Sequence, residues 1–310
     1  MTSLASARTA TPAIAASPAV RPLVDARWLK AHLGQPGLIV LDVRQAAPRG
    51  PADVFGAGHV PGAVHTDFTD WRVTTDGVPN MLPPIAALER LIGSLGIGNG
   101  DHVVIVASGQ CAADLANATR IHWTFKVLGH DRVSVLDGGW AAWAADAGNP
   151  VATERTPHVV KPFTAAVRPE LVATLDGVRA KVMAGARTLI DVRSSDQHLG
   201  FARTAQVAAS GTLPRAVNLE PDALYDPVAK RFALPDEIRE EAETASVPLE
   251  GDLTVFCNTG HLATLGWFAL SELLGNPTVA LYDGSMAEWT ADPLRPLDNA
   301  PTPALPTWTP

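Results

Sequence analysis

The chain has few cysteines, no surplus of positive charge and no long apolar run, and each of these scarcities excludes a class of protein. Two cysteines in 310 residues, Cys111 and Cys257, supply neither a disulfide framework nor the paired ligands of a zinc site. A formal net charge of -8 without clustered Lys or Arg argues against nucleic acid as a partner. No stretch reaches the roughly 18 apolar residues of a membrane span. We therefore expect a reduced, cytoplasmic protein that binds no metal, nucleic acid or membrane.

Length and composition favour two globular domains. The 310 residues exceed one typical small domain, and 46% hydrophobic against 18% charged residues excludes disorder throughout. Residues 1–21 are rich in Ala, Ser and Thr, which predicts a disordered leader, with a weak export or transit signal as the alternative. Residues 293–310 are proline-rich, which predicts an extended tail.

Three sequence blocks recur in the same order with nearly constant spacing, which indicates a duplication. They are LIVLDVR at 38–44 and TLIDVR at 188–193, HVPGAVH at 59–65 and TLPRAVN at 212–218, and LGHDRVSVLDGGWAAW at 128–143 and LGNPTVALYDGSMAEW at 274–289. We expect a first domain at residues 22–146, a linker at 147–172 and a second domain at 173–292.

Each copy alternates short apolar strands with helical patterns, which is typical of an α/β fold with parallel strands and right-handed crossovers. In the first copy the predicted strands are residues 38–42, 63–66, 103–106 and 133–136, and the predicted helices are 83–95 and 114–128. The runs LIVL, VVIV and LTVF are apolar on both faces, as strands inside a parallel sheet are. We expect two domains, each a small parallel sheet flanked by helices.

Cys257 follows the predicted strand 253–256, and the helical pattern resumes at about Leu262. The hexad CNTGHL at 257–262 is therefore a strand-to-helix turn, in which main-chain N–H groups and the positive end of the helix favour a thiolate. The hexad has no Lys, Arg, Asp or Glu, so the main chain must stabilise the anion almost alone, with His261 as a helper. Ligands of open α/β sheets bind at the carboxyl ends of strands, where this turn lies.

An inert packing role is the alternative for Cys257, but a polar loop with a glycine is a poor place to bury a sulfur. The hexad after TVF, the block LYDGSMAEW and the earlier DVR together resemble the active loop of rhodanese-like sulfurtransferases. The duplication, with GHVPGAVH and VSVLDGGWAAW in the first copy, is similar to the tandem two-domain form, the thiosulfate and 3-mercaptopyruvate sulfurtransferases. The resemblance covers approximately residues 22–292.

The resemblance implies a ping-pong transfer of sulfane sulfur without a metal or organic cofactor. A Cys257 thiolate takes sulfur from thiosulfate or 3-mercaptopyruvate, and the persulfide passes it to cyanide, a thiol or a protein acceptor. The implied binding residues are Asn258, Thr259, Gly260, His261, Leu262 and Arg193, in a protein expected to be a monomer. The donor stays open, because Asn258 and Thr259 match neither family pattern and Asn80 replaces a histidine of some mercaptopyruvate enzymes.

Arg193 ends a predicted strand beside the expected site. It could bind an anionic donor, or form a structural pair with Asp191 or Glu288. The family carries a further arginine four residues beyond this position, where the chain has Gln197, and Arg203 is a possible substitute.

The first copy is expected to be catalytically inactive. Its segment ASGQCAADLANA carries about four extra residues, and a longer loop would not close a tight anion cradle. Alignment through the strands places Ala107 opposite Cys257, whereas alignment through Trp143 and Trp289 places Cys111 there. We predict that Cys111 is not catalytic and that the first domain forms a wall of the cleft.

Other features have less specific readings. His59 and His65 are expected to stabilise a turn, and the turn at residues 283–285 is expected to end a strand and pack under the hexad. A cysteine phosphatase needs an arginine early in the helix after its nucleophile, where this chain has Ala263 and Thr264. The remaining rival is a rhodanese-like module that binds sulfur species or docks a partner without turnover, favoured by the missing basic residues near Cys257.

Overall fold

The computed structural model describes residues 20–46 and 50–299. Two five-stranded sheets, one in each copy of the repeat, have the orders β1-β7-β6-β2-β3 and β10-β9-β13-β14-β8. All strand pairs within them are parallel, which confirms the two α/β domains expected from the duplication. Of the expected leader and tail, residues 1–19 and 300–310 lie outside the described residues.

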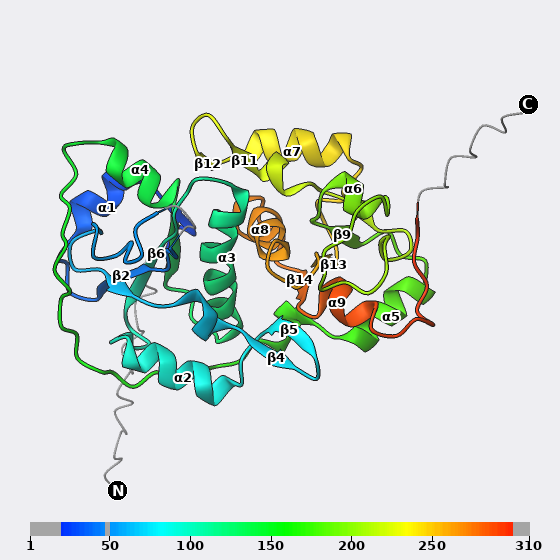
Figure 1. Cartoon of the computed structure of the whole chain (residues 1–310), viewed down its shortest axis with the longest axis horizontal. Coiled ribbons are helices and arrows are strands. Elements are labelled where there is room, and N and C mark those ends of the chain that lie inside the picture. Colours follow the sequence, from blue (N-terminus) through cyan, green and yellow to red (C-terminus); the bar gives the residue numbers. More distant parts are fainter. Residues whose placement is uncertain (1–19, 47–49, 300–310) are drawn as a thin grey trace, which may run out of the picture.

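The first sheet carries helices on both faces (Figure 1). Its strands are β1 (Leu23–Val24), β7 (Val133–Leu136), β6 (His102–Val106), β2 (Leu38–Asp42) and β3 (Val64–His65). Its helices are α1 (Ala26–His32) and α4 (Gly139–Ala145) on one face, and α2 (Ile85–Ser94) and α3 (Ala112–Val127) on the other. The strands predicted at 38–42 and 133–136 match β2 and β7 to the residue.

The second sheet repeats this plan. Its strands are β10 (Val217–Asn218), β9 (Leu189–Asp191), β13 (Leu253–Phe256), β14 (Val279–Tyr282) and β8 (Val172–Ala173). Its helices are α5 (Leu175–Met183) and α9 (Ser285–Trp289) on one face, α7 (Pro235–Thr244) and α8 (Ala263–Trp267) on the other, and the short α6 (Ser195–His198) after β9. A π-helical segment, η4 (Phe268–Leu273), continues α8.

The central strands are mostly apolar on both sides because both of their faces are covered. In β6, Val103 and Ile105 belong to the core under α2 and α3, whereas Val104 and Val106 belong to the core under α1 and α4. A strand covered on one face only would alternate apolar and polar residues.

The two domains share one hydrophobic core. Helices α3 and α8 lie side by side in the middle of the molecule (Figure 1), and residues of both belong to the same buried cluster. At their contact the hydroxyl oxygens of Thr119 and Thr264 are 2.9 Å apart and hydrogen-bond. Burial of these apolar side chains between the domains stabilises their association.

A hairpin from each domain reaches over the other domain, and sequence analysis predicted neither. They are β4 (Val73–Thr75) with β5 (Val78–Met81), after the 3₁₀ turn η1 (Phe68–Trp71), and β11 (Tyr225–Asp226) with β12 (Arg231–Phe232), after η3 (Pro221–Leu224). Just after β5, Leu82 N–H donates to Asp283 at 2.6 Å, and in β12 Phe232 N–H donates to Asp137 at 3.0 Å. Each hairpin therefore binds the corresponding turn of the other domain.

The expected linker follows the surface of the first domain. Lys161 N–H donates to Gly93 O at 3.1 Å, and Ala166 N–H donates to Leu128 O at 2.9 Å. The turn η2 (Pro169–Leu171) and the start of β8 already fall within residues 147–172, so the second sheet takes up the end of this segment.

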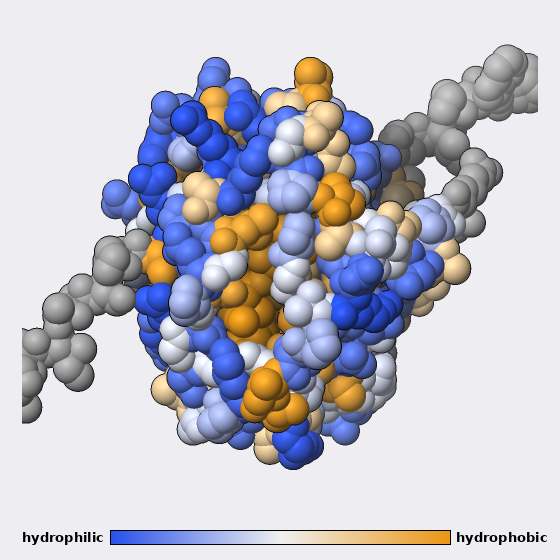
Figure 2. Space-filling model, turned by 90° about the vertical axis from the view of Figure 1, so that its left-hand side faces the viewer, coloured by the Kyte–Doolittle hydropathy of each residue, from blue (hydrophilic) through white to orange (hydrophobic). Residues whose placement is uncertain are grey.

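The end of the molecule formed by the first domain is shown in Figure 2. Apolar residues gather in a hollow in the middle of this face, with hydrophilic residues around it. Within residues 20–46 and 50–299, no helix is both long and apolar enough to span a bilayer.

Candidate active site

Cys257 is the first residue after β13, the central strand of the second sheet. It is a free cysteine with 2% of its surface exposed. Residues 257–262, here called the active loop, connect β13 to α8 as the sequence predicted. The sulfur therefore lies at the carboxyl end of a parallel sheet, almost entirely covered by protein.

The turn after β14 packs against the active loop and is hydrogen-bonded to it. The Ser285 hydroxyl accepts hydrogen bonds from the N–H groups of Cys257 at 3.1 Å and Gly260 at 3.0 Å, and donates to Tyr282 O at 2.8 Å. The carbonyl oxygens of Cys257 and Asn258 accept N–H groups from the start of α9 at 3.0 and 2.9 Å. The expected packing of this turn under the hexad is confirmed.

Two residues with positive φ permit this close approach. Gly260 has φ +71°, and a Cβ there would lie 2.5 Å from Asp283 O, so only glycine fits without displacing the turn. Ser285 has φ +51°, a strained conformation for a residue with a side chain. The strain is offset by the three hydrogen bonds of its hydroxyl group.

Of the five loop positions after Cys257, all except Gly260 present unused main-chain donors. In the part of the chain that the structure describes, the N–H groups of Asn258, Thr259, His261 and Leu262 donate to no protein acceptor. Buried or half-buried N–H groups without a protein acceptor are rare in folded proteins. These amides are available to an anion bound beside Cys257.

Side chains from outside the loop contact both polar residues that follow the cysteine. Asn258 Nδ2 donates to Gln197 Oε1 at 2.7 Å, and Asn80 Nδ2 donates to Thr259 Oγ1 at 3.0 Å. Gln197 and Asn80, like Asn258 and Thr259 themselves, are positions at which the chain departs from the family pattern. The departures therefore meet at the active loop, where they replace charged or ionisable groups with neutral amides.

His261 is neutral at physiological pH. Burial lowers its pKa to about 3, and the positive charges of Arg120 and Arg72 act in the same direction. Its ring lies 5.3 Å from the Phe68 ring, and its Nε2 is enclosed without a hydrogen-bond partner among the described residues. The imidazole therefore cannot stabilise a thiolate as a cation, although a neutral N–H can still donate.

Arg193, which the sequence assigned to donor binding, lies in an internal brace instead. Its guanidinium donates to both Asp191 oxygens at 2.8 and 2.6 Å and to Gly211 O at 2.8 Å, with 1% of the residue exposed. Burial opposes the charge of Asp191, but hydrogen bonds from Arg193, His198 and Thr212 keep the pKa of this carboxyl below its usual range. The pairing that the sequence left open as an alternative is the one that the structure contains.

The first domain repeats this brace without a catalytic residue beside it. Arg44 Nε donates to Asp42 at 2.9 Å and Arg44 Nη2 donates to Gly58 O at 2.7 Å, as Arg193 does with Asp191 and Gly211. A contact found in both copies belongs to the fold, not to the chemistry of one site. Arg203, the suggested substitute, donates to Val207 O at 2.8 Å.

The first domain instead supplies an arginine that sequence reasoning missed. Arg120 on α3 donates through Nη1 to Gly260 O at 3.2 Å and to Asp283 Oδ1 at 2.5 Å, and through Nη2 to Asn80 O at 2.9 Å. It is 2% exposed and lies over the Trp123 ring. A charged residue inside the apolar stretch TRIHWTFKV was the available signal, because a buried charge needs a partner.

The structure also decides between the two alignments of the copies. Trp140 N–H donates to Ala107 O, as Met286 N–H donates to Cys257 O, so Ala107 is the counterpart of Cys257. Cys111 is exposed and caps the start of α3. The expected longer loop is wrong: residues 107–111 lead directly into the 16 residues of α3, whereas α8 and η4 have 5 and 6, so the extra length extends the helix.

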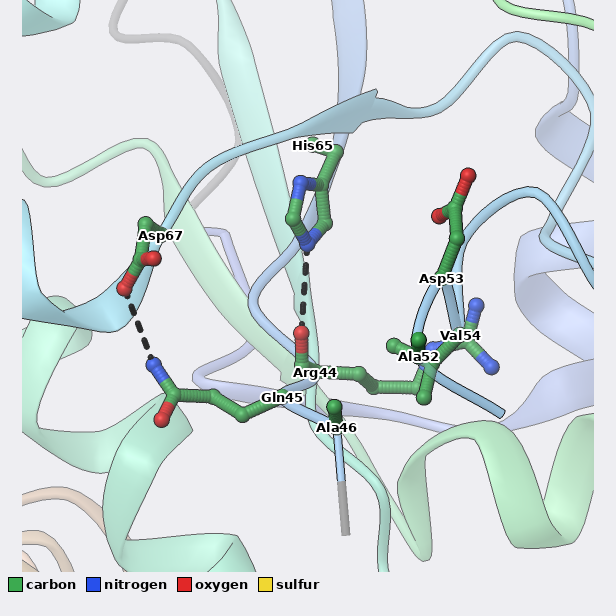
Figure 3. Close-up of a pocket in the computed structure, with 8 residues that line it drawn as sticks. All are labelled: Arg44, Gln45, Ala46, Ala52, Asp53, Val54, His65 and Asp67. Carbon is green, nitrogen blue, oxygen red and sulfur yellow. Dashed lines mark hydrogen bonds between the residues drawn. The ribbon is translucent and has the colours of Figure 1, made fainter. Parts of the chain in front are cut away.

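A separate pocket of about 310 Å³ lies in the first domain (Figure 3), and neither cysteine is among its lining residues. In it His65 Nε2 hydrogen-bonds Arg44 O at 3.1 Å, and Gln45 donates to Asp67 at 3.1 Å. The pocket has acidic side chains but no nucleophile, so the active loop remains the candidate for chemistry.

His59 Nδ1 hydrogen-bonds Phe55 O at 2.7 Å, in agreement with the turn-stabilising role expected of it. Within the described ranges no cluster of His, Cys, Asp and Glu is arranged as a metal site.

Comparison with known proteins places these features in a family. The model of the rhodanese-like domain matches residues 25–146 and 174–292. Thiosulfate sulfurtransferase of Mus musculus is 32% identical over 283 residues, covering 87% of this chain and 92% of that protein. Thiosulfate/3-mercaptopyruvate sulfurtransferase 2 of Arabidopsis thaliana is 30% identical over 301 residues, covering 89% and 86%.

Solved structures share the fold at lower identity. The anaerobic ergothioneine biosynthesis enzyme from Chlorobium limicola has a TM-score of 0.78 at 22% identity, with 91% of this chain and 71% of that chain covered. YnjE has a TM-score of 0.78 at 21% identity, with 91% and 69% covered. With two matched domains, a duplicated sheet and relatives similar over most of their length, the chain belongs to the tandem-domain rhodanese-like sulfurtransferase family.

Proposed function

We propose that Cys257 carries a sulfane sulfur as a persulfide from a small anionic donor to a thiophilic acceptor. The observation that carries the proposal is a free cysteine at the carboxyl end of the central strand, next to four main-chain N–H groups without protein acceptors. Such donors stabilise both a thiolate and the negative charge of a persulfide. The N–H groups of Asn258, Thr259, His261 and Leu262 form this cradle, Gly260 permits its tight turn against Asp283, and Arg193 braces the end of the neighbouring strand β9 through Asp191.

The transfer has two halves. With thiosulfate, the Cys257 thiolate forms a bond to the outer sulfur, the S–S bond breaks, and sulfite leaves with its electron pair. With 3-mercaptopyruvate the C–S bond breaks, and the departing enolate takes a proton to become pyruvate. An acceptor such as cyanide then attacks the outer sulfur of the persulfide, forms thiocyanate and restores the Cys257 thiolate.

Thiosulfate and 3-mercaptopyruvate are the donors that we propose, and cyanide, a thiol or a protein are the acceptors. Support comes from the relatives, which are named thiosulfate or thiosulfate/3-mercaptopyruvate sulfurtransferases. We further propose that the chain acts as a monomer in the cytoplasm, where reducing conditions keep a lone active cysteine as a thiol.

A rhodanese-like module without turnover is the second candidate. It is favoured by the 2% exposure of Cys257 and by the lack of a basic side chain within residues 257–262. Such a module would bind a sulfur species or a partner and release no product in an assay with donor and cyanide.

Mass spectrometry tests the proposal directly. After incubation with thiosulfate or 3-mercaptopyruvate, the peptide with Cys257 should gain about 32 Da, and cyanide should remove the gain and release thiocyanate. Cys257→Ser should abolish both signals, whereas Cys111→Ser should leave them unchanged. A gain mapped to Cys111, or turnover by Cys257→Ser, would remove Cys257 from the mechanism. A gain at Cys257 that cyanide cannot discharge would favour the module without turnover.

A further inference from the structure

Both proposed donors are anions, yet among the described residues the arginines expected to serve the active loop from the second domain, Arg193 and Arg203, are already engaged. Arg193 is held by Asp191 and Gly211, and the Arg203 guanidinium donates to Val207 O. Gln197 occupies the position of the family's second arginine, and residues 257–262 contain no Lys or Arg. The positive charge that faces the donor has to come from elsewhere.

Arg72 of the first domain lies beside the active loop. It follows η1 directly, and its guanidinium carbon lies 4.7 Å from the centre of the Phe68 ring. The same Phe68 ring lies 5.3 Å from the ring of His261, a residue of the active loop. Phe68 therefore links the arginine of one domain to the loop of the other.

Apart from the Phe68 ring, the charge of Arg72 has no bonded partner in the described part of the chain. Its guanidinium makes no hydrogen bond and no ion pair there, although the residue is partly buried. Burial and the like charge of Arg120 lower the pKa of Arg72, and only Asp67 acts in the opposite direction. Arg120 is neutralised by Asp283, whereas Arg72 is a partly buried cation that an anion would stabilise.

We propose that Arg72 binds the anionic group of the sulfur donor, the sulfonate-like oxygens of thiosulfate or the carboxylate of 3-mercaptopyruvate. A guanidinium can donate two parallel hydrogen bonds to either group. The silent first domain thus contributes the substrate-binding cation, and the second domain contributes the nucleophile. The inference rests on the function proposed above.

Steady-state kinetics separate binding from chemistry. In Arg72→Gln the KM for either donor should rise about tenfold to a hundredfold, with a smaller change in kcat, and Arg72→Lys should recover part of the loss. Arg90→Gln is the matched control, because it removes one exposed positive charge from the same domain, on α2. An unchanged KM in Arg72→Gln, or an equal rise in Arg90→Gln, would overturn the assignment.

Equilibrium binding keeps the inference independent of turnover. Calorimetry should show thiosulfate binding to Cys257→Ser, and the dissociation constant should rise about tenfold or more when Arg72→Gln is added. No binding to Cys257→Ser, or equal binding with and without Arg72, would reject the role of Arg72. If thiosulfate binds in this Arg72-dependent way but the native chain forms no persulfide, the proposed function fails while the anion site stands.

Discussion

The two copies of the repeat are built alike around the strand that carries the site, and they differ in what surrounds its end. In both copies, the carbonyl of the first residue after the strand accepts an N–H from the helix that follows the Asp-Gly turn. Trp140 donates to Ala107 in the first copy, and Met286 donates to Cys257 in the second. Both also contain the Asp–Arg brace. These shared contacts maintain the fold, since they persist where no chemistry is expected.

Besides the cysteine, two differences around the strand end are one hydroxyl group and one arginine. Ser285, which binds two N–H groups of the active loop, is replaced by Gly139 in the first copy, where φ is +55°. Asp283 is paired with Arg120 from the other domain, whereas within the described residues Asp137 has no ion pair and burial raises its pKa. An active copy therefore needs its cysteine, a loop held by the Ser285 hydroxyl group, and Arg120 from the inactive first domain.

Moving the cysteine from the second copy to the first should have the largest effect. Ala107→Cys in a Cys257→Ser background should leave activity at least about a thousandfold below that of the native chain, because the first copy lacks counterparts of the Ser285 hydroxyl group (the serine anchor) and of Arg120 (the arginine clamp). Thiocyanate release and persulfide mapping at residue 107 provide the measurement. Turnover from residue 107 would show that the strand end alone is sufficient, and that Ser285 and Arg120 are dispensable.

The arginine clamp should give the next largest effect. Arg120→Met leaves Asp283 buried and unpaired, so we expect a loss of about 3 kcal/mol in unfolding free energy and a ten- to hundredfold loss in kcat/KM. Asp283→Asn should behave similarly, whereas Asp137→Asn in the silent turn should leave kcat/KM unchanged. Equal losses in the two aspartate variants would show that the turns are equivalent.

A structural role alone would lower stability without changing the chemistry of folded molecules. Arg120→Lys, which keeps the charge, should therefore recover stability more completely than the rate of persulfide formation, because it cannot contact Gly260, Asp283 and Asn80 together. Arg168→Met, which breaks the half-exposed pair with Asp131, is the control and should cost less than about 1 kcal/mol.

Replacing Ser285 should have a smaller effect, and it should change activity more than stability. Ser285→Gly relieves the positive φ but removes the hydroxyl, so stability should change by less than about 1 kcal/mol while kcat/KM falls about tenfold. Ser285→Ala keeps the strain and should lower both. If Ser285→Gly retained full activity, the glycine of the silent turn would be no obstacle to catalysis.

Much of this arrangement was predictable, because it depends on local pattern. Strands 253–256 and 133–136 were placed to the residue by apolar runs bounded by turns, and Cys257 was identified by its position after such a run. The donor-binding role of Arg193 was misjudged, because an arginine two residues after an aspartate has the same local sequence whether it faces a ligand or its neighbour.

The remaining features depend on contacts between distant parts of the chain. Arg120 lies 140 positions from Gly260, and the Phe68 ring that supports Arg72 meets His261 only once the domains pack together. No periodicity within one segment encodes these contacts. The extension of α3 was hidden for a related reason, since extra residues after a strand can lengthen either a loop or a helix. Here they lengthen the helix, which starts just after Cys111 and whose Asp114 carboxylate accepts the Gln110 N–H.

The last difference between the copies is the histidine in the active loop, for which residues 107–111 contain no equivalent. Burial lowers the pKa of His261 to about 3, below its ordinary 6.5, so between these values the unfolded chain binds more protons than the folded one. This contribution to stability is complete above pH 6.5 and is lost as the pH falls toward 3, with a slope of at most about 1.4 kcal/mol per pH unit.

His261→Asn should therefore flatten the fall in unfolding free energy between pH 6.5 and 4.5, measured by urea denaturation, whereas His158→Asn on the exposed linker should not. His122, buried with its pKa also lowered to about 3, should maintain part of the slope in both variants. Because His261 stays neutral over this range, it should add no inflection to the pH dependence of kcat/KM. An unchanged slope in His261→Asn would mean that the histidine titrates in the folded chain, and the active loop would then carry a cation of its own.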